Sequence, residues 1–172
     1  MRAKGFTLIE LLVVISVIIF LSAILLPNFR SADRQAGFRR SAAKLVQDLR
    51  GAEESSMSVK SSKQCSQGVE GYALNFNSGD NYYSFRVKCK GEGGFKQIDD
   101  FYFEKGVKIK DITVDGSSLV STYVYFSPPD PSVFIFKSGG SGTVATIALS
   151  LINNSSQTKN IQINKAGLIY AE

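Results

Sequence analysis

The chain has 172 residues, of which 44% are hydrophobic, and a formal net charge of +5, but it contains no histidine and no tryptophan. This length suits one domain of about 100–150 residues behind an anchor. Without histidine, a Ser–His or Cys–His catalytic base and a histidine metal ligand are excluded. We therefore expect no enzyme and no cofactor.

The first 26 residues are the most informative part of the sequence. A basic leader with Arg2 and Lys4 ends at Gly5, and an apolar run then extends from Phe6 to Leu26, with Glu10 as its only charge. As a helix, this run is about 32 Å long, enough to cross a bilayer core. A secretory signal has a shorter apolar region with a small-residue cleavage site behind it. We therefore expect a cut before the run, which leaves a transmembrane helix on the mature protein.

A carboxylate inside a membrane-spanning helix is costly, roughly 2.5–3.5 kcal/mol on insertion scales, so Glu10 is a predicted functional residue. A buried charge needs a partner of opposite sign, and the mature helix has no side-chain cation near Glu10. The free amine of another subunit would supply one. Such a pair would also set the axial register of the two helices, because only one stagger neutralises the carboxylate.

The segment from Lys4 to Val14, K-G-F-T-L-I-E-L-L-V-V, resembles the N-terminal signature of type IV prepilins and type II secretion pseudopilins. The resemblance implies that a prepilin peptidase cuts between Gly5 and Phe6 and methylates the Phe6 amine, and that Glu10 pairs with the Phe6 amine of a neighbouring subunit. It implies a single-pass protein of the cytoplasmic membrane that later joins other pilin or pseudopilin subunits. The product would be an extracytoplasmic filament, either a periplasmic pseudopilus or a cell-surface pilus. A generic membrane anchor is the alternative.

The helix is expected to continue over residues 27–62, with a kink at Pro27, because proline removes a backbone hydrogen bond and crowds the carbonyl four residues earlier. Apolar residues at spacings of four and three predict one stripe of an amphipathic helix: Phe38, Ala42, Leu45, Leu49 and Ala52. Such a helix could be half buried on its own domain and half buried among other subunits. Packing of the stripe on its own domain alone remains the alternative.

Beyond the helix, the pattern changes to period two and predicts a β-rich domain over residues 63–172. We expect strands at 72–76, 82–89, 96–104, 107–114, 123–127, 132–136, 143–151, 158–163 and 168–171. The prolines within 128–131 predict a loop, and 139–142 is expected to be a flexible hairpin tip. A long helix followed by short strands predicts an α+β fold, with the N-terminal helix packed on a C-terminal antiparallel β-sheet domain as in pilins.

The end of the chain resembles the closing hairpin of the GspH/FimT-type minor pseudopilins, in the residues Ile161, Ile163, Gly167, Leu168 and Ile169. That family often has an arginine after the closing glycine, where this chain has leucine. The resemblance implies a minor subunit that primes or caps a filament. A bulk pilus subunit is the alternative.

The two cysteines, Cys65 and Cys89, both lie in the part expected outside the membrane. That compartment is oxidising, so two cysteines there favour one disulfide. Two separate free thiols are the alternative.

A second functional hypothesis is a DNA-binding minor pilin for DNA uptake. Basic residues gather in two groups, with Tyr82, Tyr83 and Phe85 beside the first. The groups are Arg86, Lys88, Lys90 and Lys96, and then Lys105, Lys108 and Lys110. Basic patches with aromatic residues can bind nucleic acid through phosphate contact and stacking. A half-exposed strand gives the same alternation, so we favour a non-catalytic structural subunit. A lone membrane-anchored receptor domain is a third hypothesis.

Other acidic and polar clusters point to no chemistry. Asp99 and Asp100 are adjacent, so in a strand they would point to opposite faces and could not form an acid–base pair. The oxygen-rich segments 77–81 and 111–116 do not match the calcium-binding loop pattern. We expect simple turns there and no metal site.

Overall fold

A computed structural model of the chain describes residues 5–58, 61–128, 132–137 and 139–172, and the side chains of residues 25–31 lie outside the described set. The chain divides into two compact units, one up to Ala36 and one from Gly37 onward. One helix, α1 (Leu8–Met57), precedes eleven strands. The helix ends at Met57, within the expected segment 27–62.

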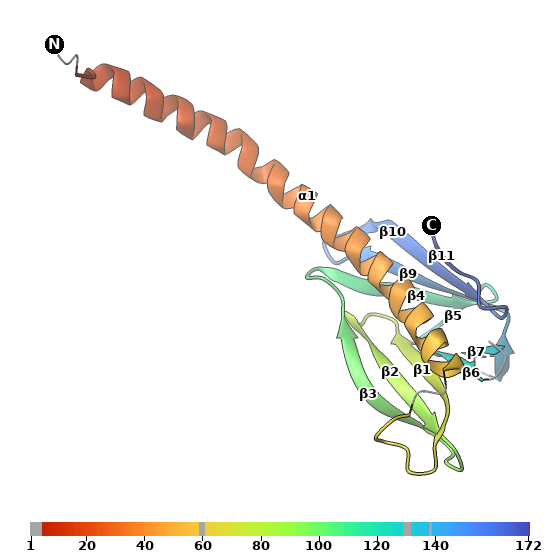
Figure 1. Cartoon of the computed structure of the whole chain (residues 1–172). Helices are drawn as coiled ribbons and strands as arrows, with labels where there is room; N and C mark the ends of the chain where they lie inside the picture. The colour runs from red at the N-terminus through yellow and green to blue at the C-terminus, as the bar shows by residue number, and fades with distance from the viewer. Residues whose placement is uncertain (1–4, 59–60, 129–131, 138) are drawn as a thin grey trace. The chain divides into compact units, whose positions relative to one another are not determined.

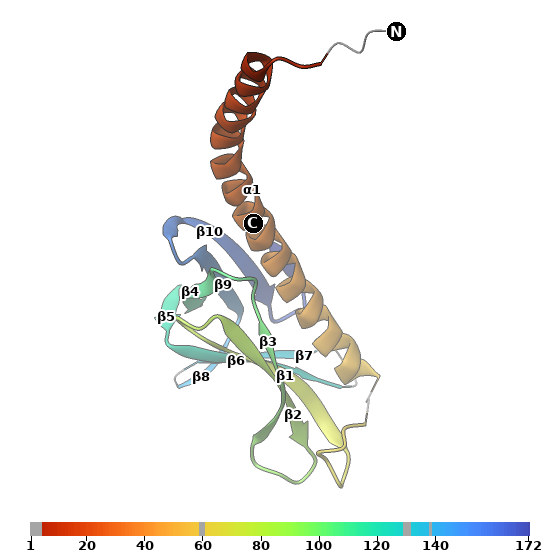
Figure 2. The same ribbon diagram turned by 90° about the vertical axis from the view of Figure 1, so that its left-hand side faces the viewer.

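The strands form two antiparallel sheets (Figures 1 and 2). The six-stranded sheet has the order β3-β2-β1-β6-β7-β8. Its strands are β1 (Val69–Asn77), β2 (Tyr82–Cys89), β3 (Phe95–Tyr102), β6 (Ser121–Ser127), β7 (Ser132–Lys137) and β8 (Gly140–Gly142). The five-stranded sheet has the order β11-β10-β9-β4-β5. Its strands are β4 (Val107–Val114), β5 (Ser117–Leu119), β9 (Val144–Leu151), β10 (Asn154–Asn164) and β11 (Ile169–Ala171). The predicted α+β fold, with a helix on antiparallel sheets, is confirmed.

The first part of α1 is an apolar helix without a break in its backbone assignment. Ser16 donates a hydrogen bond from Oγ to the carbonyl of Val13 at 2.8 Å, so this polar group is satisfied within its own turn. The helix is assigned continuously through position 27. The side chain of Pro27 lies outside the described set, so the kink at this residue stays a prediction.

The second part of α1 packs against both sheets. All five residues of the predicted stripe are buried in one core cluster with residues of both sheets: Phe38, Ala42, Leu45, Leu49 and Ala52. Burial of each leucine side chain contributes about 1.5–3 kcal/mol. The predicted amphipathic stripe is confirmed, and the segment of α1 from Gly37 to Met57 lies across the two sheets in both views (Figures 1 and 2).

Two buried serines of α1 connect the helix to the backbone of the strands and of the connection between β3 and β4. Ser56 donates from Oγ to the carbonyl of Phe126 at 3.0 Å and accepts from the N–H of Tyr72 at 3.1 Å. Ser41 accepts from the N–H of Glu104 at 3.1 Å. Buried polar groups cost free energy unless they are hydrogen-bonded. These bonds therefore fix where the helix lies on the sheets, in addition to the non-directional packing of the stripe.

The structure corrects three expectations about the strands. Gly140–Gly142 is not a flexible tip but strand β8, which pairs with β7 through Lys137 and Gly140. Strand β5 was not predicted, because its three residues carry no alternating pattern. Strand β10 begins at Asn154, before the predicted strand 158–163, with an irregular register between Asn154 and Thr158. In each case, pairing with a neighbouring strand stabilises a segment whose own side-chain pattern does not predict a strand. Most of the predicted proline-rich loop, residues 129–131, lies outside the described residues.

The turn between β4 and β5 is hydrogen-bonded to the segment that connects β8 of one sheet to β9 of the other. Asp115 and Gly116 have φ angles of 50° and 79°, as a tight hairpin turn with two left-handed residues requires. One carboxylate oxygen of Asp115 accepts hydrogen bonds from Thr143 N at 2.9 Å, Thr143 Oγ1 at 2.6 Å and Val144 N at 3.1 Å. The other pairs with Lys137 Nζ at 2.8 Å. These donors, with Lys137 first among them, hold the pKa of Asp115 far below its ordinary value.

The first prediction concerns Asp115→Asn. A carboxyl whose pKa is lowered by folding stabilises the protein above the pKa of the unfolded chain, about 3.9, and this contribution is lost as pH falls toward the folded-state pKa. We expect the variant to unfold at lower urea concentration than the native chain at pH 7, with the difference shrinking below about pH 4. The control is Glu54→Gln, which removes a charge from an exposed position. A stability difference that does not change with pH would contradict the assignment.

Candidate functional site

The N-terminus of α1 is closed by a reciprocal pair of hydrogen bonds between Thr7 and Glu10. The N–H of Glu10 donates to Thr7 Oγ1 at 3.3 Å, and the N–H of Thr7 donates to Glu10 Oε2 at 3.4 Å. The hydroxyl of Thr7 also lies 3.3 Å from the same carboxylate oxygen. The Thr7 carbonyl accepts from the N–H of Leu11 at 3.2 Å. This arrangement is a capping box, in which Thr7 is the N-cap and Glu10 the third helical residue.

Thr7 is a capping residue that the sequence analysis above does not include. The signal is present in the sequence, because threonine followed three residues later by glutamate, directly before an apolar run, is typical of a helix start. In the structure Glu10 has an uncharged hydrogen-bond partner on its own chain, because Thr7 donates its N–H to Glu10 Oε2.

The predicted cleavage position lies just before this cap. Gly5, Phe6 and Thr7 are exposed and precede the first helical residue, Leu8. A side chain added at Gly5 would meet nothing within 4 Å. The fold of the chain itself therefore does not require glycine at this position.

The apolar residues that follow the cap are exposed. The exposed fractions of their large side chains range from 48% at Ile15 to 83% at Leu8, and this exposure continues to Ile24. No helix within the described part of the chain is both long and apolar enough to cross a membrane. The expected span 6–26 includes positions 25 and 26, whose side chains lie outside the described set, so the membrane-spanning segment stays a prediction.

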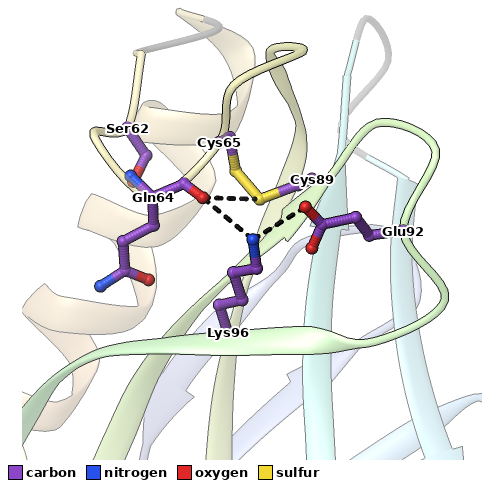
Figure 3. Close-up of a disulfide and its surroundings, with 6 residues drawn as sticks. All are labelled: Ser62, Gln64, Cys65, Cys89, Glu92 and Lys96. Carbon is purple, nitrogen blue, oxygen red and sulfur yellow. Dashed lines mark hydrogen bonds and ion pairs between the residues drawn. A yellow bond between two sulfur atoms is a disulfide. The ribbon is translucent and has the colours of Figure 1, made fainter.

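Cys65 and Cys89 are joined by a disulfide in the structure, with their Cα atoms 5.2 Å apart (Figure 3). Cys89 ends β2 and is buried with Val69, Tyr72 and Val87, while Cys65 lies in the loop after α1. The bond therefore attaches this loop to the six-stranded sheet.

Lys96 of β3 reinforces the same junction. Its Nζ donates to the carbonyl of Gln64 at 3.1 Å and pairs with Glu92 at 2.8 Å, as Figure 3 shows. The Gln64 carbonyl also lies 3.6 Å from the Sγ of Cys89. The loop after α1 is thus held by one covalent and one polar contact.

Arg86, Lys88 and Lys96 of the first basic group make contacts within the chain. Lys88 pairs with Glu70 at 2.6 Å, an interaction that raises the pKa of Lys88. Its Nζ also lies 5.5 Å from the ring centre of Tyr125, and the guanidinium of Arg86 lies 5.6 Å from that of Tyr123. Binding of phosphate by these cations would compete with contacts that they already make.

The aromatic residues named beside the basic group are not the ones that contact it. Tyr83 is buried in the core and donates its hydroxyl to Asp48 of α1, so it cannot stack on a base. Burial, reinforced by the Asp48 carboxylate, raises the pKa of Tyr83 well above its ordinary value. The rings near the cations come from β6, which pairs with β1 and not with β2. Sequence proximity therefore pointed to the wrong aromatic residues.

The structure describes no arrangement suited to metal binding. Within residues 5–58, 61–128, 132–137 and 139–172, no group of three or more His, Cys, Asp or Glu side chains is placed to hold a metal ion. In the segment 77–81, Asp80 accepts a hydrogen bond from the side-chain amide of Asn77 at 3.0 Å. In the segment 111–116, Asp115 binds the donors described above.

The second prediction concerns the disulfide, which joins residues 24 positions apart. In the chain-entropy account a loop of this size contributes roughly 3–4 kcal/mol. We expect Cys65→Ala/Cys89→Ala to lower the free energy of unfolding by about that amount. A reductant should destabilise the native chain but not the double variant, which serves as the control. Alkylation of both cysteines in the exported protein without reductant would contradict the disulfide.

Comparisons with known proteins bear mainly on the N-terminal segment. Residues 1–26 match the family described as the prokaryotic N-terminal methylation motif. The type IV wide pilus major component PilA4 of Thermus thermophilus is 59% identical over 35 residues, which are 20% of this chain and 27% of that relative. The chain thus spans little more than a quarter of the length of the curated relative that it matches.

Two crystal structures of the type IV minor pilin FimU from Pseudomonas aeruginosa (strain PAO1) are similar to this structure. The TM-scores are 0.48 and 0.45 at 13% and 14% sequence identity. The similarity covers 81% and 78% of this chain and 90% and 91% of those chains. The chain thus carries the prokaryotic N-terminal methylation motif in residues 1–26 and has an α+β fold.

Proposed function

We propose that this chain is a non-catalytic structural subunit of a type IV pilus or type II secretion pseudopilus. It is made as a prepilin and held in the cytoplasmic membrane by residues 6–26. A prepilin peptidase cuts it between Gly5 and Phe6 and methylates the Phe6 amine. The processed subunit then joins other pilin or pseudopilin subunits through its N-terminal helix.

The observation that carries this proposal is the exposed apolar surface of α1 directly behind a capped, non-helical junction. Exposed apolar surface of this extent is typical of an interaction or membrane surface. A helix that is apolar on all sides must be covered on all sides. Lipid can cover it before assembly, and the helices of other subunits can cover it afterwards. Its position within the methylation motif, which covers residues 1–26, supports both stages.

Glu10 is the assembly residue of this proposal. The nearest basic side chain after it in the sequence is Arg30, about 30 Å away along a helix. Once the apolar surface is covered, an uncompensated carboxylate is expensive. The Phe6 amine of a neighbouring subunit would neutralise it. Because the pair requires one axial stagger, it would also set the register of the subunits.

The outer face of the second part of α1 offers further contacts with other subunits. Its inner stripe is used by the chain's own core. Its outer face is exposed and mostly polar, and it includes Arg39, Ala43, Lys44, Gln47 and Arg50. This division supports a helix that serves its own domain with one face and the filament with the other.

We place the chain among the minor subunits, on the resemblance of its closing hairpin to the GspH/FimT-type pseudopilins. Ile161, Ile163 and Ile169 of that hairpin are buried, as a closing element of the core should be. A bulk pilus subunit is the alternative. DNA binding is not favoured, because Lys88 and Lys96 are paired with Glu70 and Glu92.

The third prediction separates the charge of Glu10 from its role in the cap. Glu10→Gln keeps a side chain that can complete a capping box but removes the charge, whereas Glu10→Ala removes both. Both variants should enter the membrane and be cleaved. Both should enter filaments at least about tenfold less than the native chain, because the neighbour's amine would be buried without a counter-charge.

The measurement is the amount of processed subunit in sheared filaments, relative to the amount in membranes. Lys105→Gln, in the exposed turn between β3 and β4, serves as a control for the loss of a charge outside the helix. Normal filament incorporation of Glu10→Gln would rule out the charge pair and leave Glu10 with a capping role alone.

A further inference from the structure

We infer that Thr7 is a positioning residue for processing. The Thr7–Glu10 capping box starts the helix at Leu8 and so keeps the Gly5–Phe6 peptide bond out of it. This inference rests on the proposed function, because it assumes that the bond is cut there. It differs from the assembly role of Glu10, since it assigns a task to the threonine hydroxyl before any neighbour is present.

The geometry gives the hydroxyl two contacts at the helix start. Thr7 Oγ1 accepts from the N–H of Glu10 at 3.3 Å and lies 3.3 Å from Glu10 Oε2. The same carboxylate oxygen accepts from the N–H of Thr7 at 3.4 Å. The first N–H groups of any helix lack partners within the helix. The box satisfies the N–H of Glu10, which would otherwise have to find another acceptor.

The acceptors available upstream are the backbone carbonyls of the cleavage region. If the helix extended backward with its regular i to i−4 bonds, the N–H of Ile9 would bind the carbonyl of Gly5, and that of Glu10 would bind the carbonyl of Phe6. The Gly5 carbonyl is the one that the peptidase must attack. A backward extension would place it inside a hydrogen-bonded turn.

An apolar environment favours such an extension when the cap is absent. Near lipid, an unsatisfied backbone N–H is costly, and a helix is the structure that satisfies it. The hydroxyl of Thr7 removes this need for a backbone acceptor at Glu10, because Thr7 Oγ1 accepts the hydrogen bond of the Glu10 N–H in place of a carbonyl oxygen. The chain can then leave the helix at Phe6, where Gly5, Phe6 and Thr7 are exposed in the structure.

The test compares Thr7→Val with Thr7→Ser in the full-length precursor. Valine keeps the shape and the β-branch of threonine but has no hydroxyl, whereas serine keeps the hydroxyl and serves as the matched control. Precursors are placed in lipid vesicles with the prepilin peptidase, and the rate of cleavage at Gly5–Phe6 is measured by mass spectrometry. Loss of an N-cap side chain shifts helix-start equilibria by roughly twofold to thirtyfold. We expect Thr7→Val to be cut at least about threefold more slowly than the native precursor.

Three further results complete the test. Thr7→Ser and Glu10→Gln should be cut at close to the native rate, because both retain a capping box. Amide hydrogen exchange at Glu10 should remain slow in Thr7→Val, and the Ile9 amide should gain protection, because an extended helix bonds its N–H to the Gly5 carbonyl. Native cleavage kinetics for Thr7→Val, or equal slowing of Thr7→Ser, would overturn the inference. Absence of cleavage in the native precursor would instead overturn the proposed function.

Discussion

The apolar surface between Phe6 and Ile24 must be kept from water, and this requirement governs the rest of the molecule. Burial of apolar surface is worth about 25 cal/mol per Å², so a helix exposed on every side cannot remain alone in solution. The only charge in this segment, Glu10, lies in its first turn, where the positive end of the helix dipole favours a carboxylate. Glu10 thus helps to start the helix within its own chain, and in our proposal the same carboxylate pairs with the amine of a neighbouring subunit.

The second part of α1 meets a different requirement, because it has to hold the sheet domain in one position. Burial of Leu45 and Leu49 stabilises the contact between the helix and the sheets, but apolar packing is non-directional and does not fix the orientation of the helix. Ser56 and Ser41 supply direction through hydrogen bonds to the backbone of β6 and of the connection between β3 and β4. The disulfide and Lys96 then hold the loop that follows the helix. The helix is therefore fixed along its length and at its end within the second unit.

Much of this could be predicted from the sequence wherever one residue pattern governs one element. The spacing from Phe38 to Ala52 predicted the buried stripe, and alternation predicted β4 to the residue. Features set by distant partners could not be predicted in this way. Strand β8 depends on β7, and Tyr123 and Tyr125 reach Arg86 and Lys88 only because β6 pairs with β1. The Thr7–Glu10 cap depends on local sequence alone, so threonine followed three residues later by glutamate could have predicted it. The charge of Glu10 by itself did not indicate a cap.

The most direct test of the account is the N-terminus of the mature protein. Mass spectrometry of the chain recovered from membranes and from sheared filaments should give one start site in both. The account predicts a chain that begins at N-methylated Phe6 and keeps the whole apolar segment, because that surface is what anchors and then assembles the subunit. A mature chain that begins beyond Leu26 would have lost the surface and the Glu10 charge together. That result would contradict the account.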